Sequence, residues 1–535
     1  MSTETPSAIN LRRLSPIDFL ERSATIYRDK VAVVDGEVRR TYPQVLDRVY
    51  RFAHALVRLG VRKGDRVAVL AKNESALLEA HYAVPLAGAI LCALNIRLVR
   101  PEIEYIVGHC GASVVIYDAE FAPLVDGLDA RVARIAIGGD GSVAELAALQ
   151  AAAPYEPIEN PVIGEDETIS INYTSGTTGQ PKGVMYTHRG AYQNALAEIF
   201  HANLRAESVY LWTLPMFHCN GWCYPWAVTA AGATHVCLPK VDPAKVFALT
   251  ESEHVTHFCG APTVLISLAN HPGARTFSHQ VHVITAGAPP APTTIAQIEA
   301  LGATITQVYG LTETYGPITV CAWQSQWDAL DTAGRARMKA RQGVSMLTVG
   351  AGDIRVVRTE PGPGGELVDV PRDGATPGEI VMRGNNVMKG YYNDPEATAK
   401  AFAGGFFHSG DVAVRHEDGY LEIVDRAKDV IVSGGENIST VQIEKAILEH
   451  PGVLECAVVA KPDEKWGEVP KAFVTPKPGV TLTADEIVVH CRSRLPGFKT
   501  PKTIEFCDLP KTSTGKIQKY VLREREWAGR EKRVN

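Results

Sequence analysis

The sequence predicts an α/β protein, in which a large N-terminal domain of layered sheets with flanking helices precedes a small α+β C-terminal domain. Three observations support this. The chain has 535 residues, and a single hydrophobic core rarely grows that large. Strand-like and helix-like segments alternate through the first half, which is typical of parallel sheets covered by helices. After Arg426 the pattern changes to two helices and several strands, enough for a separate small domain.

The N-terminal elements are predicted from the spacing of apolar residues. Residues 42–59 have apolar side chains at helical spacing, and residues 66–70 (RVAVL) form a short apolar run typical of a buried strand. A helix is expected over residues 74–84, with Pro85 just beyond its end. The next strand-like run contains residues 89–94.

The C-terminal elements begin with a β-hairpin. Residues 411–425 alternate apolar and polar side chains on either side of a Glu-Asp-Gly turn. Strand-like segments follow at residues 457–460 and 471–474. We place the domain boundary within residues 425–428, which gives an N-terminal domain of residues 1–427 and a C-terminal domain of residues 428–535.

Two helices of this second domain carry start signals. Ser439 and Gln442 have the spacing of a capping box, ahead of a helix expected at residues 441–449. Thr483 and Glu486 form a second such pair, and the helix after them should stop at Pro496.

Composition excludes several classes of protein. The formal net charge of −6 gives no electrostatic reason to expect binding to nucleic acid or to an anionic membrane. No signal peptide, bilayer-spanning run or C-terminal targeting tripeptide is visible. The ten cysteines show no CxxC pair, which is typical of reduced thiols in the cytoplasm. We therefore expect a cytoplasmic protein, and the sequence leaves a homodimer open.

One cluster of metal-binding residue types needs a separate interpretation. His218, Cys219 and Cys223 lie close together in the stretch HCNGWC. A zinc site would require a fourth ligand, and the sequence does not show one. Packing cysteines are also far commoner than ligands. We interpret these cysteines as small apolar residues.

The stretch YTSGTTGQPKG, residues 173–183, has the composition of a phosphate-binding loop. Glycines allow backbone N–H groups to turn toward one point, hydroxyls add donors, and a lysine adds positive charge. It is not a Walker loop, because GxxxxGK[ST] is absent. The candidate phosphate ligands are Thr174, Ser175, Gly176, Thr177, Thr178, Gly179 and Lys182.

This stretch resembles the phosphate-binding signature of the adenylate-forming superfamily. That superfamily contains acyl-CoA synthetases, the adenylation domains of peptide synthetases and beetle luciferases. Further motifs of the family follow in the expected order, so the resemblance covers most of the chain. It implies an ATP-dependent acyl-CoA ligase with a mobile C-terminal domain, which uses Mg²⁺ and coenzyme A.

The resemblance assigns the nucleotide site to several short motifs. VYGLTET, residues 308–314, is similar to the adenine and magnesium motif, so Tyr309 would stack on adenine, Thr312 would contact the α-phosphate and Glu313 would hold Mg²⁺. Asp411 would bind the ribose hydroxyls, and Ser409 replaces the usual threonine two residues earlier. The remaining nucleotide contacts implied by the family motifs are Gly287, Ala288, Pro289, Gly310 and Arg426.

Lys516, in LPKTSTGK, resembles the family's catalytic lysine of adenylation. The resemblance implies that it approaches the α-phosphate and the attacking carboxylate, and then withdraws as the small domain rotates about a hinge near Lys428. The pantetheine arm of CoA would pass residues of the SGGEN stretch, namely Ser433, Gly434, Gly435 and Glu436. The candidate catalytic residues are thus Lys516, Glu313, Thr174 and His218.

The acyl site is assigned from the stretch WTLPMFHCNGW, residues 212–222. His218 occupies the family's aromatic gate position. The aspartate that binds an amino acid's amine in peptide synthetases is absent here, so an amino acid substrate is not expected. Gly310 stands where acetate-specific relatives carry a tryptophan. We therefore expect an acid larger than acetate, of medium chain length, branched or aromatic.

Two alternatives remain. An enzyme that loads an acyl carrier protein shares the core motifs, so the sequence does not separate it from a CoA ligase. A non-catalytic nucleotide-binding protein on the same fold is the other alternative. The presence of Lys182, Glu313, Asp411 and Lys516 argues against it.

Overall fold

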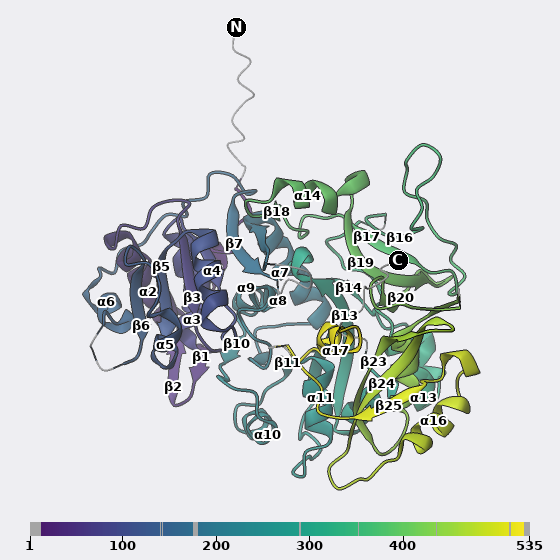
Figure 1. Cartoon of the computed structure of the whole chain (residues 1–535). Helices are drawn as coiled ribbons and strands as arrows, with labels where there is room; N and C mark the ends of the chain where they lie inside the picture. Colours follow the sequence, from purple (N-terminus) through teal and green to yellow (C-terminus); the bar gives the residue numbers. More distant parts are fainter. Residues whose placement is uncertain are drawn as a thin grey trace. The chain divides into compact units, whose positions relative to one another are not determined.

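The computed structural model describes residues 12–528, apart from residues 140, 142, 175–179, 288–289, 351, 435 and 513–514. The chain divides into two compact units, and Figure 1 labels many of their elements. The first unit consists of Met1–Lys240, Thr312–Gly316 and Asn385–Pro395, and the second of Val241–Leu311, Pro317–Gly384 and Glu396–Asn535. The domain boundary at residues 427/428 stays a prediction.

The first unit is built on a seven-stranded sheet in the order β18-β8-β7-β4-β3-β5-β6. Neighbouring strands from β7 to β6 are parallel, as expected from the strand–helix alternation. β8 and β18 add an antiparallel edge. The strands are β3 Arg66–Leu70, β4 Ile90–Ala93, β5 Ala112–Asp118, β6 Ala133–Ile137, β7 Thr168–Tyr173, β8 Gly183–Thr187 and β18 Gly390–Tyr391.

Four more strands belong to this unit. Parallel β9, β10 and β1 are joined by antiparallel β2. They are β1 Val31–Asp35, β2 Val38–Thr41, β9 Val209–Leu211 and β10 Thr234–Val236. The helices of the unit are α1 Asp18–Ile26, α2 Tyr42–Arg58, α3 Ser75–Leu86, α4 Arg100–Cys110, α5 Ala122–Val125, α6 Leu146–Ala152, α7 His188–Ala202, α8 Cys219–Trp222 and α9 Tyr224–Ala231, with short 3₁₀ turns at Ala119–Phe121 and Thr312–Thr314.

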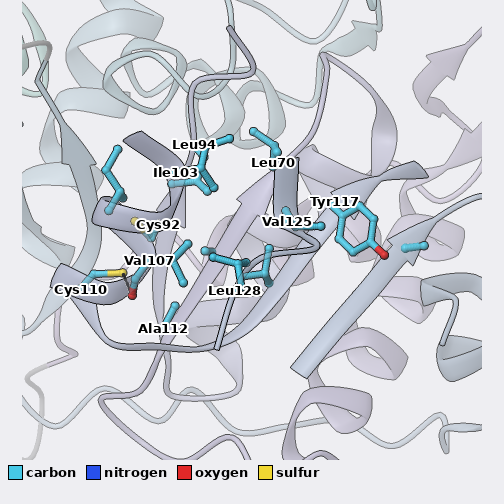
Figure 2. Packing of buried hydrophobic residues seen from close by; sticks show 14 residues of the cluster. Leu70, Cys92, Leu94, Ile103, Val107, Cys110, Ala112, Tyr117, Val125 and Leu128 are labelled. Carbon is cyan, nitrogen blue, oxygen red and sulfur yellow. Dashed lines mark hydrogen bonds between the residues drawn. The ribbon is translucent and has the colours of Figure 1, made fainter. Parts of the chain in front are cut away.

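A hydrophobic core lies where α4 covers the parallel strands (Figure 2). Side chains from the strands and from α4 interdigitate there, which removes apolar surface from water and fixes the sheet. Tyr173, the last residue of β7, packs against the edge of this core. The core therefore supports the strand that leads into the glycine- and hydroxyl-rich stretch. Its buried members include Leu70, Cys92, Leu94, Ile103, Val107, Cys110, Tyr117, Val125 and Leu128.

Helix α3 runs further than predicted. The helix was expected to end before Pro85, but it continues to Leu86 with Pro85 inside it. Every residue of α3 is buried. Proline in a helix interior removes a backbone hydrogen bond. Burial of every side chain of the helix offsets that loss.

The second unit contains three groups of strands: β11 to β15, a four-stranded sheet, and the sheet of the C-terminal part. β11, β12 and β13 are parallel, and β14 pairs with β15 in the antiparallel sense. A four-stranded antiparallel sheet has the order β16-β17-β19-β20. The strands are β11 His257–Cys259, β12 Val281–Thr285, β13 Ala303–Leu311, β14 Gly316–Val320, β15 Val344–Ser345, β16 Ile354–Val357, β17 Gly378–Met382, β19 Phe407–Arg415 and β20 Leu421–Arg426.

The C-terminal part of this unit is the α+β arrangement that the sequence predicts. Its sheet has the order β22-β21-β24-β23, with β25 beside β24, and side chains of α15 and α16 join its core. The strands are β21 Ile431–Ser433, β22 Glu436–Ile438, β23 Val453–Asp463, β24 Gly467–Pro476 and β25 Thr503–Phe506. The helices of the whole unit are α10 Pro243–Ser252, α11 Pro262–Ala269, α12 Pro292–Ala300, α13 Thr332–Lys339, α14 Pro395–Ala401, α15 Thr440–Leu448, α16 Ala484–Arg492 and α17 Lys519–Glu526, with 3₁₀ turns at Ser325–Ala329, Ala403–Gly405 and Gly497–Lys499.

Of the two predicted capping boxes, one forms completely. Thr483 and Glu486 bond reciprocally at the start of α16. At the start of α15 the Ser439 hydroxyl accepts from the Gln442 amide at 3.1 Å, but the Gln442 side chain accepts a hydrogen bond from Lys499 instead. A tertiary partner has therefore replaced the second half of that box. None of the helices that the structure describes has the length and apolar character needed to span a bilayer.

Candidate active site

The glycine- and hydroxyl-rich stretch begins and ends on neighbouring antiparallel strands of the first unit. Tyr173 of β7 lies opposite Gly183 of β8, and the Thr174 amide donates to the Lys182 carbonyl at 3.0 Å. A Cβ on Gly183 would lie 3.1 Å from the Tyr173 ring, so glycine lets the two strands close. Of the predicted phosphate ligands, Ser175, Gly176, Thr177, Thr178 and Gly179 lie outside the described residues.

Lys182 and Glu313 share a tyrosine neighbour. The Lys182 Nζ atom lies 4.9 Å from the centroid of the Tyr391 ring and 3.8 Å from an Asp394 carboxylate oxygen. The Tyr391 hydroxyl donates to Glu313 Oε1 at 3.0 Å. Burial and the Glu313 carboxylate raise the pKa of Tyr391 well above its ordinary value, so the hydroxyl stays protonated and keeps donating. Tyr391 thus links the predicted phosphate lysine to the predicted magnesium carboxylate.

Sequence reasoning missed Tyr391. It belongs to the short strand β18, whose pairing with β8 brings it beside the loop base. In the sequence it is one of two adjacent tyrosines after Gly390, and that pattern alone indicates no role.

Glu313 is suited to a magnesium ion that arrives with a nucleotide. The Glu313 carbonyl accepts from the Met388 amide at 2.7 Å. The Glu313 side chain is half-buried. Over the part of the chain that the structure describes, no three His, Cys, Asp or Glu side chains are grouped to hold a metal. Mg²⁺ keeps several waters and commonly binds one or two carboxylates together with substrate phosphates. A single carboxylate near Lys182, the lysine predicted to bind phosphate, therefore fits this use.

Thr312 lies against the segment that carries His218. The Tyr186 hydroxyl donates to the Thr312 carbonyl at 2.6 Å, and the Cys219 sulfur lies 3.6 Å from the Thr312 hydroxyl. His218 is half-buried, and its Nε2 atom lies 3.8 Å from Cys219 Sγ. Burial raises the pKa of Cys219 to about 12, so this cysteine is a protonated thiol at neutral pH.

The backbone after His218 is left-handed over five residues. The φ angles of Cys219, Asn220, Gly221, Trp222 and Cys223 are 45°, 40°, 53°, 52° and 64°. Non-glycine residues in this conformation cost roughly 1–2 kcal/mol each. Such a run persists only where surrounding contacts hold it.

The nucleoside-binding candidates gather in the second unit. The Tyr309 hydroxyl donates to Asp411 Oδ2 at 2.8 Å. Asp411 and Arg426 face each other across β19 and β20, with Arg426 Nε at 3.3 Å from Asp411 Oδ1. Both carboxylate oxygens therefore already have partners, which fixes the orientation of Asp411. The Tyr309 side chain is buried, and its stacking on adenine stays a prediction.

Ser409, Gly287 and Gly310 belong to the same unit. Ser409, which replaces the family threonine, donates to the Ile380 carbonyl at 2.6 Å and accepts from the Asp411 amide at 3.1 Å, so its hydroxyl supports the Asp411 turn. Gly287 follows β12 with a φ of +96°, and Gly310 lies beside Tyr309 in β13. Ala288 and Pro289 lie outside the described residues.

Lys516 lies in the same unit, among charges of both signs. Its amide donates to the Thr512 hydroxyl at 3.0 Å, and the preceding Gly515 has a φ of +83°. A Cβ on Gly515 would collide with the Thr263 side chain, so the loop packs closely on the start of α11. Desolvation, followed by the positive charge of Arg426, lowers the pKa of Lys516 to about 7 although the Asp411 carboxylate opposes this shift.

The predicted hinge and pantetheine residues are placed separately along this unit. Burial and the charge of Arg426 lower the pKa of Lys428. Ser433 and Glu436 pair across the β21–β22 hairpin, and the Gly434 amide donates to the Trp466 carbonyl at 2.8 Å. A Cβ on Gly434 would press on the Trp466 ring. Gly435 lies outside the described residues.

The structure thus brings the predicted residues together in two groups. In the first unit, Thr174 and Lys182 share the loop base, Lys182 and Glu313 share Tyr391, and Thr312 contacts the residue after His218. In the second unit, Tyr309, Asp411 and Arg426 are directly bonded, and Lys516 is within electrostatic range of the latter two.

Comparison with known protein families identifies the family of this chain. The chain matches a family described as "AMP-binding enzyme" over residues 20–392, and "AMP-binding enzyme C-terminal domain" over residues 442–516. The chain belongs to the AMP-binding enzyme family, whose members form adenylates. Within it, the chain is an AMP-forming acid–CoA ligase.

The curated relatives match over nearly their whole length. An acetate–CoA ligase of Humulus lupulus is 43% identical, over 97% of this chain and 95% of the relative. A 4-hydroxybutyrate–CoA ligase of Metallosphaera sedula is 43% identical, over 95% of this chain and 94% of the relative. A 2-methylpropanoate–CoA ligase of Humulus lupulus is 44% identical, over 96% of this chain and 95% of the relative.

Solved structures agree with this fold. The crystal structure of ATP-bound MatB from Rhodopseudomonas palustris superimposes with a TM-score of 0.83 at 29% sequence identity. The match covers 95% of this chain and 98% of that chain. The α/β fold with a large N-terminal and a small C-terminal domain is therefore confirmed.

Proposed function

We propose that this ligase activates a carboxylic acid larger than acetate, of medium chain length, branched or aromatic, and transfers the acyl group to coenzyme A. The observation that carries the size limit is Gly310, which follows Tyr309 in β13 and adds no side chain where a tryptophan would fill space. Named relatives act on 4-hydroxybutyrate and 2-methylpropanoate, which supports larger and branched acids. Another is named for acetate, so the lower size limit must be measured.

In the proposed first step, a carboxylate oxygen of the acid attacks the α-phosphorus of ATP. A new P–O bond forms as the bond to pyrophosphate breaks, giving acyl-adenylate and pyrophosphate. Such a transfer needs positioning and charge neutralisation more than covalent help. We assign positive charge to Lys182 and Lys516 and donors to Thr174 and Thr312. Mg²⁺ on Glu313 would offset phosphate charge.

In the second step, the sulfur of CoA attacks the acyl carbonyl, the thiol proton passes to solvent, and the bond between the acyl carbon and the AMP oxygen breaks, so that AMP leaves. Lys516 is not needed for this attack, and the thiol requires the space that the lysine occupied. We therefore propose that residues 428–535 move as a domain about Lys428, and that Ser433, Gly434 and Glu436 then line the path of the pantetheine arm. His218 would open the acyl site at the same stage. We also propose a cytoplasmic location, although some relatives are named as peroxisomal.

The test is an acid screen with AMP and pyrophosphate release as the readout. The panel runs from acetate and propionate to laurate, with 2-methylpropanoate, benzoate and cinnamate. We expect kcat/KM for the best acid to exceed that for acetate by at least about tenfold. A preference for acetate would overturn the size proposal. If no acid of the panel caused release of AMP, the ligase proposal would be overturned.

Two further measurements accompany the screen, one on a variant and one on the acyl acceptor. A Gly310→Trp variant should shift the preference toward acetate by about tenfold or more, and unchanged selectivity would contradict the role of this position. Competition between CoA and a phosphopantetheinyl carrier protein as acceptor separates the CoA ligase from a carrier-loading enzyme. We expect CoA to be used first.

A further inference from the structure

Asn220 is the second residue of the left-handed turn after His218. The turn comprises Cys219 to Cys223, and the Asn220 side chain is fully buried. Asparagine tolerates the left-handed region better than most residues, but an exposed asparagine or a glycine would serve equally well for that purpose. A buried polar side chain needs hydrogen-bond partners. The buried Asn220 amide can therefore hold the turn in place through those partners.

Both ends of the Asn220 amide are bonded to other elements of the first unit. Its Oδ1 atom accepts from the Ser170 hydroxyl at 2.7 Å, and its Nδ2 atom lies 3.3 Å from His81 Nε2. Ser170 belongs to β7, the strand that leads into the phosphate-binding stretch. The Ser170 oxygen also lies 3.4 Å from the Tyr315 hydroxyl. One amide therefore connects the turn to β7, to α3 and to the segment after Glu313.

The donors and acceptors of the hydrogen bonds from Leu77 through His81 to Asn220 can be assigned without conflict. His81 Nδ1 lies 2.8 Å from the Leu77 carbonyl, which can only accept, so Nδ1 carries the proton. His81 Nε2 is then an acceptor and receives a hydrogen from Asn220. Burial lowers the pKa of His81 to about 4, which keeps this neutral tautomer at physiological pH. The amide orientation of Asn220 is thus set by its partners.

The turn also contacts the loop of Thr312 to Gly316. Cys219 reaches the Thr312 hydroxyl at 3.6 Å. A Cβ on Gly316 would lie 3.0 Å from the Trp222 backbone, so this loop packs directly on the turn. The Tyr315 carbonyl accepts from Asn194 at 2.9 Å. His218 directly precedes the turn, and Thr312 packs against it. The turn therefore holds both residues in place.

We propose that Asn220 is a positioning residue: by holding the left-handed turn, it fixes the location of His218 relative to Thr312 and thus aligns the carboxylic acid with the α-phosphate. The proposal rests on the proposed function, because it presumes those roles for His218 and Thr312. Asn220 acts through these residues and need not touch a substrate.

The test separates the hydrogen bonds from the backbone conformation. Asn220→Gly keeps the left-handed turn accessible without strain but removes the amide. We expect kcat/KM for the acid to fall by about tenfold or more, while KM for ATP changes less than about twofold. The matched control is Asn203→Gly, because Asn203 is also left-handed, with a φ of 55°, but lies exposed at the end of α7. That variant should retain wild-type kinetics.

Ser170→Ala removes the same hydrogen bond from the side of its donor. If both residues act through it, the double variant Asn220→Gly/Ser170→Ala should be no slower than the slower single variant. Wild-type kinetics in Asn220→Gly, an equal rise of KM for ATP, or additive losses in the double variant would overturn the proposal. Each of these outcomes leaves wild-type ligase activity, and hence the proposed function, intact.

Hydrogen exchange read by mass spectrometry supplies a readout that needs no substrate. Backbone amides of residues 216–223 and 312–316 should exchange faster in Asn220→Gly than in the wild type, with no change in Asn203→Gly. Unchanged exchange in both segments would contradict the support that Asn220 is proposed to give, whichever acid the enzyme uses.

Discussion

Lys516 lies near two positive side chains, Arg426 and Lys428, and two carboxylates, Asp411 and Asp429. Desolvation and the positive neighbours prevail, and the pKa of Lys516 falls to about 7. A lysine with this pKa loses its charge within the physiological range. Because its proposed task is to neutralise negative charge at the α-phosphate, the charged form is the active one.

Adenylation should therefore decline as the pH rises through about 7. In the free enzyme Lys516 is protonated below its pKa, and kcat/KM reports ionisations of the free enzyme. The measurement is the pH profile of ATP–pyrophosphate exchange. Lys516→Arg keeps a charge at every pH and should remove this decline even if its maximal rate is lower. The same decline in the arginine variant would assign it to another group.

Tyr391 offers a second prediction at this scale. Tyr391→Phe keeps the ring beside Lys182 but removes the donor to Glu313. A lost hydrogen bond to a charged group is worth about 1.5–3 kcal/mol, so kcat/KM for ATP should fall by about tenfold or more. Tyr392→Phe changes the adjacent residue in the same way and should have little effect. Equal losses in both variants would show that the Glu313 bond is not the cause.

Single residues also show what the sequence can and cannot predict. Tyr309, Asp411 and Arg426 were assigned from short motifs, and the structure joins them directly. Tyr391 and Asn220 were not assigned. Their importance follows from partners far away in the sequence, and no local pattern records a partner of that kind.

At the scale of elements, local signals predicted those parts of the fold that depend on neighbouring residues. The strand expected at residues 66–70 is β3, and the helix expected at residues 42–59 is α2, Tyr42–Arg58. Local signals failed where tertiary contacts dominate. Pro85 lies inside α3 because the whole helix is buried, and Gln442 bonds Lys499 rather than completing its box. Nor did the sequence indicate that β7 and β8 are antiparallel.

The loop that carries Lys516 provides the prediction for an element. Gly515→Ala places a methyl group against Thr263, and it also strains a φ of +83°. Adenylation should fall by about tenfold or more, because the loop must shift and Lys516 with it. Gly479→Ala is the matched control, since its φ of +76° carries the same strain but nothing lies within 4 Å of the added carbon. Comparable losses in both would point to backbone strain of roughly 1 kcal/mol rather than to the collision.

At the scale of the whole molecule, the chain must serve two reactions in turn. In the mechanism that we propose, the first requires Lys516 at the phosphate, whereas the second requires that it be absent. A rigid-body movement of a small domain meets both requirements with one lysine. The domain boundary that we propose at residues 427/428 supplies the hinge.

Restricting this hinge should separate the two reactions. Lys428→Pro fixes φ near −65° and should slow CoA-dependent release of AMP from preformed acyl-adenylate by about 100-fold, while ATP–pyrophosphate exchange changes less than about fivefold. Lys428→Ala, which removes the side chain but leaves the backbone free, should retain the thioester step. Equal loss of both half-reactions in the proline variant would argue against a hinge at this residue.

The two compact units are interleaved along the chain, and this has a consequence for synthesis. The first unit begins at Met1 but includes Thr312–Gly316 and Asn385–Pro395, the pieces that supply Glu313 and Tyr391. At roughly 5–20 residues per second, a ribosome needs tens of seconds between the first strands of that unit and its last piece. Until then the nascent sheet lacks the edge strand β18, and such an unpaired edge invites aggregation. Premature termination before Tyr391 would consequently yield insoluble fragments rather than a smaller enzyme.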